Sequence, residues 1–120
     1  MTAIGPLQLR IMQEIWKLGP TDVHAVHQAL NIQGTKKLAY TTILTVMRNL
    51  VKRAFLDQQR EGRKHRFIPL IDQGTYALAM VRNLRLELFG GNVLRLLGCI
   101  ADDDGIDPLK RRRIRELALE

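Results

Sequence analysis

The spacing of apolar positions predicts three helices in the first half of the chain. The first begins after Gly5-Pro6, because proline is tolerated in an opening helical turn, and ends at Gly19-Pro20. The second runs from Val23 to about Asn31, after the N-cap pair Thr21-Asp22. The third runs from about Ala39 to Arg53 and carries apolar residues at i, i+3, i+4 and i+7: Ile43, Val46, Met47 and Leu50.

Two short alternating runs around a glycine turn follow the third helix. They extend from Phe55 to Arg60 and from His65 to Pro69, and they flank Glu61-Gly62-Arg63-Lys64, a pattern typical of a β-hairpin. The segment from Ile32 to Leu38, which contains Gly34, is expected to be a loop. Helix, short helix, helix and hairpin is the element order of a winged helix-turn-helix.

The pattern changes from Asp72 onward, where three further helices are expected. One spans Tyr76–Phe89, the next follows Gly90-Gly91 with Asn92 as its cap, and the last opens at Asp107-Pro108. These helices carry more apolar surface than they can bury among themselves, so a second copy of the chain is the expected partner. The residues expected at that interface are Leu84, Leu88, Phe89, Val93, Leu94, Leu97, Ile100 and Leu117.

The fold class is therefore expected to be mostly α with a small β-hairpin, in two parts. Residues 1–71 form a winged-helix domain and residues 72–120 an α-helical dimerisation unit. The length of 120 residues suits one compact domain, or one small domain with a helical appendage. With no bilayer-spanning apolar run, no signal-peptide pattern and a single cysteine, Cys99, we expect a cytoplasmic protein without membrane insertion.

The distribution of charge along the chain indicates a class of binding partner. Residues 1–71 hold eleven Lys and Arg side chains against four Asp and Glu, an excess of seven positive charges, whereas residues 72–120 hold eight of each. Such a localised field favours a polyanion, although charge alone supports a solvated basic face equally well. Together with the winged-helix order it favours double-stranded DNA over the alternative, a winged-helix adaptor that binds another protein.

The expected DNA contacts lie on the polar face of the third helix and on the hairpin. Short hydroxyls suit phosphates or base edges, and arginine suits the O6 and N7 acceptors of guanine. The candidates derived in this way are Thr41, Thr42, Thr45, Arg48 and Lys52 on the helix, and Arg63 and Lys64 at the hairpin tip.

The sequence offers little support for metal binding or enzymatic activity. His24 and His27 share a helix face but lack a third ligand nearby, so we expect solvated or capping histidines and no metal. Cys99 is expected to be a small core or interface residue. The chain contains no serine, no nucleophile elbow and no phosphate-binding glycine loop. We therefore expect neither an enzyme nor a bound cofactor.

The stretch from Leu38 to Leu50, followed by Arg60-Glu61-Gly62-Arg63 and Phe67, resembles the penicillinase-repressor family of bacterial regulators. That family includes β-lactamase, methicillin-resistance and copper-responsive repressors. The resemblance implies a homodimer that binds a dyad-symmetric operator and represses transcription. It places Tyr40, Thr41, Thr42, Thr45 and Arg48 on the DNA-recognition helix and Arg63 and Lys64 on the wing. Another small winged-helix regulator family is the nearer alternative.

The chain departs from the family pattern at two places. It ends without the cysteine cluster of the copper-responsive members, which argues against direct copper sensing. The antibiotic-responsive members are inactivated by cleavage at an Asn-Phe pair, where this chain has Gly98-Cys99. An inactivating protease is therefore left open as a further partner.

Overall fold

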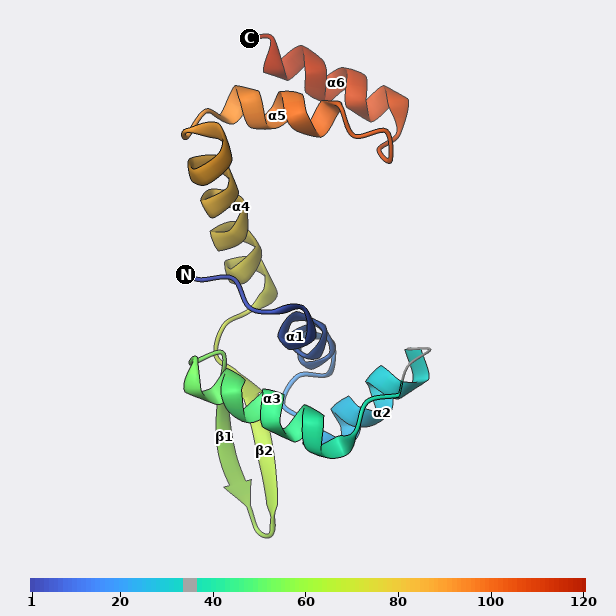
Figure 1. The fold of residues 1–120 in the computed structure, drawn as a ribbon, viewed down its shortest axis with the longest axis vertical. Coiled ribbons are helices and arrows are strands. Elements are labelled where there is room, and N and C mark those ends of the chain that lie inside the picture. Colours follow the sequence, from blue (N-terminus) through green and yellow to red (C-terminus); the bar gives the residue numbers. More distant parts are fainter. Residues whose placement is uncertain (34–36) are drawn as a thin grey trace. The chain divides into compact units, whose positions relative to one another are not determined.

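A computed structural model describes residues 1–33 and 37–120 (Figure 1). The elements follow the order α1 (Pro6–Leu18), α2 (Val23–Gln33), α3 (Tyr40–Lys52), β1 (Leu56–Glu61), β2 (Lys64–Pro69), α4 (Gln73–Phe89), α5 (Val93–Ala101) and α6 (Pro108–Ala118). The chain divides into two compact units, Met1–Ala77 and Leu78–Glu120, with the division inside α4.

The core of the first unit is built from α1, α2, α3 and the base of the hairpin. Its buried side chains alternate with polar ones at the spacing of each element, and the largest fully buried ones are Ile11, Met12, Ile15, Val26, Ile43, Met47, Leu50, Leu56 and Phe67. Phe67 also ties β2 to the start of α2. Its amide donates to the Thr21 carbonyl at 2.7 Å, and the Thr21 amide donates to the Phe67 carbonyl at 3.0 Å. The hairpin is therefore attached to the helices by backbone bonds as well as by packing.

The hairpin pairs β1 and β2 in one antiparallel register, from Leu56 opposite Pro69 to Glu61 opposite Lys64. Gly62 occupies the turn with φ of +61°, a left-handed conformation that glycine adopts without a Cβ penalty. Burial falls from the base of the hairpin, where Leu56 and Phe67 are buried, to its exposed tip. The tip is thus a projection whose side chains are available to a partner.

An aromatic cluster joins the start of α4 to the other elements of the first unit. The Tyr76 ring lies 5.9 Å from Trp16 and 5.7 Å from Phe55, centroid to centroid. The Tyr76 hydroxyl accepts a hydrogen bond from the Ile4 amide at 3.1 Å, and Trp16 Nε1 donates to the Ile71 carbonyl at 2.9 Å. Both polar atoms of this cluster are therefore paired.

The second unit contains the remainder of α4, α5 and α6, and α5 packs against α6. Asn92 caps α5 by accepting from the amides of Leu94 and Arg95. At the other end of α5, the Ala101 carbonyl accepts from Arg111 Nε at 2.9 Å and from Arg115 Nη2 at 3.0 Å. These bonds satisfy a carbonyl that the last helical turn leaves free.

Apolar side chains remain exposed over much of the second unit. They come from all three helices and include Leu78, Val81, Leu84, Leu86, Leu88, Val93, Leu94, Ile100, Leu109, Leu117 and Leu119. Cys99 is also exposed, so it is not a core residue of this unit, and the alternative of an interface position stays a prediction.

The predicted fold class is confirmed, with differences at element ends. The second helix continues two residues further, to Gln33, and the fourth begins at Gln73, where Asp72 accepts from the Thr75 amide at 2.7 Å. Residues 34–36 of the expected loop lie outside the described residues. Within the described ranges, no helix combines the length and apolarity needed to cross a bilayer.

Candidate functional site

The polar face of α3 is exposed along its whole length. Ile43, Met47 and Leu50 are fully buried on the opposite face and fix which side of the helix faces outward. The outward side carries the helix residues that the sequence singled out: Tyr40, Thr41, Thr42, Thr45, Arg48 and Lys52. All six are exposed, so the structure brings the candidate helix residues together on one accessible surface.

Thr45 differs from the two other threonines. Its Oγ1 donates to the Thr41 carbonyl at 2.9 Å, a bond to the residue four positions earlier in the helix. The hydroxyl hydrogen is therefore engaged, which leaves Thr45 an acceptor and a methyl group toward solvent. Thr45 therefore stays a predicted DNA contact, as an acceptor and a methyl group.

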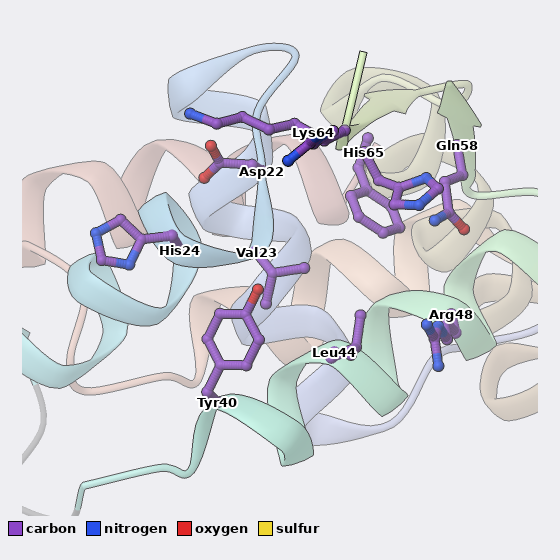
Figure 2. A pocket seen from close by; sticks show the side chains of 11 residues that line it. Asp22, Val23, His24, Tyr40, Leu44, Arg48, Gln58, Lys64 and His65 are labelled. Atoms are coloured by element: carbon purple, nitrogen blue, oxygen red, sulfur yellow. The ribbon is translucent and has the colours of Figure 1, made fainter. Parts of the chain in front are cut away.

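Arg48 borders a hollow of about 440 Å³ between α3, the start of α2 and the hairpin. Figure 2 shows Tyr40, Leu44 and Arg48 along α3, with Gln58, Lys64 and His65 coming from the hairpin. Its walls combine apolar surface from Val23, Leu44 and Phe67 with cationic side chains. Arg48 and Lys64 thus face a shared space, although they lie on different elements.

The basic residues of the hairpin fall into two classes. Arg60 Nε donates to the Gly62 carbonyl at 3.0 Å, and Arg66 contacts Glu61 at 3.6 Å and the Pro20 carbonyl at 3.5 Å. Arg63 and Lys64 have no ion pair with any residue that the structure describes, and the same holds for Arg48. These three predicted DNA-contacting cations therefore have no charge partner in the part of the chain that the structure describes.

The structure shows contacts that the sequence did not predict for two groups of residues. Gln58 and His65 line the hollow beside Arg48, and alternation along the two strands could have placed them on one face of the hairpin. His27 and Asn31 contact the Leu38 backbone just before α3. His27 thus has a backbone partner, and over residues 1–33 and 37–120 no group of three His, Cys, Asp or Glu side chains could hold a metal ion.

Comparison with known proteins shows that the chain matches one protein family. Residues 4–120 match the family model described as penicillinase repressor. Over 71 residues the chain is 37% identical to the transcriptional regulator BlaI of Mycobacterium tuberculosis, a match that covers 58% of this chain and 50% of that protein. The chain therefore spans about half the length of the curated relatives it matches.

Two solved structures are similar to the first part of the chain. One is the Bacillus licheniformis BlaI monomeric form in complex with the blaP half-operator, 29% identical with a TM-score of 0.52, covering 62% of this chain and 89% of that one. The other is the DNA binding domain of the repressor BlaI, 30% identical with a TM-score of 0.53, covering 61% of this chain and 87% of that one.

Proposed function

Because this chain belongs to the penicillinase repressor family, we propose that it is a transcriptional repressor that binds a dyad-symmetric operator as a homodimer. The prediction of a regulator, with no enzyme activity, agrees with this family of repressors. The observation that carries the proposal is the exposed polar face of α3, where Arg48 has no ion pair with any described residue and lies beside a cationic hairpin tip.

In the proposed complex, α3 lies in the major groove and the hairpin contacts the flanking backbone. Arg48 projects from the middle of α3, where a guanidinium can donate two parallel bonds to guanine O6 and N7. Arg63 and Lys64 stand at a projecting tip, where cations find phosphates more readily than a fixed base pattern. Thr41, Thr42 and Lys52 complete the helix contacts, with Thr45 as an acceptor and methyl contact. A related protein solved with a half-operator supports this arrangement.

The second unit is the proposed dimerisation surface. Six of the eight proposed interface residues are exposed (Leu84, Leu88, Val93, Leu94, Ile100, Leu117), and Phe89 and Leu97 are half-buried. This many exposed apolar side chains on three short helices favours an interface. We infer that a second copy of the chain covers this surface. A two-fold dimer presents two copies of α3, which matches the proposed operator with two related halves.

A protease that ends repression by cutting α5 would meet a structural obstacle. Gly98 and Cys99 lie inside the helix, whereas proteases bind extended segments. Cleavage at this position therefore requires local unfolding of α5.

The test is a footprint of the full chain on the DNA upstream of its own gene, followed by affinity measurements at two salt concentrations. We expect two protected half-sites with centres about 10–10.5 bp or a multiple apart. If the dimer neutralises 6–10 phosphates, affinity should fall roughly 10³–10⁵-fold between 50 and 200 mM salt. One unrepeated half-site would contradict the dimer. Salt-independent binding, or preference for an acidic protein over DNA, would contradict the repressor and favour an adaptor.

A further inference from the structure

The first turn of α3 lacks the usual side-chain cap. Its N-cap residue is Ala39, which has no side-chain acceptor for the free amides at the start of the helix. The helix nevertheless begins with three of the residues proposed to contact DNA: Tyr40, Thr41 and Thr42. This turn therefore gains no stabilisation from a side-chain cap.

Two side chains of α2 bind the backbone of Leu38, two residues before α3. Asn31 Oδ1 accepts from the Leu38 amide at 2.8 Å, and Asn31 Nδ2 donates to the Leu38 carbonyl at 3.3 Å. His27 Nε2 lies 3.0 Å from the same carbonyl and must be the donor, because a carbonyl oxygen only accepts. His27 and Asn31 are four residues apart and thus share one face of α2. Both polar groups of Leu38 are satisfied by α2.

His27 also contacts the first residue of α3. Its ring lies 5.8 Å from the Tyr40 ring at an interplanar angle of 73°, an edge-to-face arrangement. Tyr40 itself is 46% exposed and borders the hollow beside Arg48. One histidine therefore holds both the backbone before α3 and a side chain on its outward face.

We propose that His27 and Asn31 are positioning residues that fix the first turn of α3 for recognition of operator bases. Neither needs to touch DNA. Directional bonds to base edges tolerate errors of only about 0.5 Å, whereas phosphate contacts by long cationic side chains adapt to small displacements. Releasing Leu38 should consequently reduce discrimination between operator and random DNA more than it reduces binding to DNA in general. This inference rests on the proposed function.

The experiment compares Asn31→Ala, His27→Ala and Asn31→Asp with the wild-type chain. Asn31→Asp retains the acceptor for the Leu38 amide and loses the donor to the Leu38 carbonyl, so it separates the two bonds. Gln28→Ala is the matched control, since Gln28 is exposed on the same helix and its side chain has no hydrogen bond with any described residue. Two quantities are measured for each: the affinities for operator and random duplexes, and amide hydrogen exchange of the free protein at Leu38 and Tyr40–Ile43.

We expect the alanine variants to lose about 10-fold in operator affinity and less than about twofold on random DNA, with faster amide exchange at Leu38 and through the first turn of α3. Asn31→Asp should keep the protection of Leu38 and most of the affinity, and Gln28→Ala should match the wild type. Equal losses on both duplexes, or unchanged exchange, would overturn the positioning role.

Failure of the two proposals can be told apart. If the wild-type chain does not distinguish operator from random DNA, the proposed function fails. The exchange measurement, made without DNA, still decides whether His27 and Asn31 hold α3. Should one alanine variant not fold, the other provides the comparison, since His27 and Asn31 both bind the Leu38 carbonyl.

Discussion

The arginine side chains of the first unit differ in what they are bonded to. Arg53 donates to Gln8 Oε1 and to the Ala3 carbonyl and lies over the Phe55 ring, so it ties the N-terminal segment to the end of α3. Arg60 and Arg66 are bonded within the hairpin region. Arg48 and Arg63 have no such partners among the described residues, which leaves their donors for a ligand.

Replacing Arg48 with alanine should therefore act on recognition more than on folding. We expect a loss of about 1–3 kcal/mol of binding free energy on the operator and little change on random DNA, because bidentate base contacts exist only on the correct sequence. Electrophoretic or fluorescence titration on both duplexes measures this. Arg10→Ala, which removes an exposed charge from α1, controls for net charge. Equal losses on both duplexes would show that Arg48 binds phosphate.

The hairpin tip should behave in the opposite way. Arg63→Ala and Lys64→Ala are expected to weaken operator and random DNA alike, and each should reduce the slope of log affinity against log salt by about one, because each removes one phosphate contact. Arg60→Ala is the control, since the Arg60 guanidinium is already bonded to the Gly62 carbonyl. A salt slope unchanged in both tip variants would place the hairpin outside the DNA contact.

At the scale of elements, the start of α4 depends on the Tyr76 cluster. Tyr76→Phe keeps the ring against Trp16 and Phe55 but removes the acceptor of the buried Ile4 amide. We expect a loss of about 1–2 kcal/mol in the free energy of unfolding, the cost of one unpaired buried donor. Urea denaturation followed by fluorescence suits this test, because Trp16 is the only tryptophan in the chain. Tyr40→Phe, whose hydroxyl is on an exposed side chain, should unfold at the wild-type urea concentration.

Periodicity and turn residues were sufficient to predict every helix and the hairpin, because each element is defined by neighbours a few residues apart. The bond from Trp16 to Ile71 and the bonds from Asn31 to Leu38 depend on how elements pack, and no local pattern encodes that. The same limit applies to the site. Position on α3 predicted that Arg48 and Thr45 face outward, but only the structure shows that the Thr45 hydroxyl is already engaged.

At the scale of the whole molecule, charge and apolar surface are separated between the two units. The excess of positive charge lies in residues 1–71, and most of the exposed large apolar side chains lie in Leu78–Glu120. A division of this kind favours a polyanion as the partner of the first unit and a protein surface as the partner of the second. The expected domain boundary, after residue 71, stays a prediction.

Leu88→Glu tests the assignment of the second unit. Leu88 is 68% exposed, so the substitution leaves the fold of the unit intact but places a charge in the proposed interface. We expect the dissociation constant of the dimer to rise at least about 100-fold in sedimentation experiments. Leu70→Glu, at a leucine of the first unit that is 57% exposed, should leave the dimer unchanged. Dimers of equal strength in both variants would place the interface elsewhere.

The projecting hairpin has a practical consequence. Its turn combines a left-handed Gly62 with exposed Arg63 and Lys64, the residue types after which trypsin cuts. Exposed loop tips are preferred sites of proteolytic nicking. In the free protein this turn should be an early tryptic site, and bound duplex should shield it. The rate of one cleavage therefore reports occupancy of the wing without any label on the protein or the DNA.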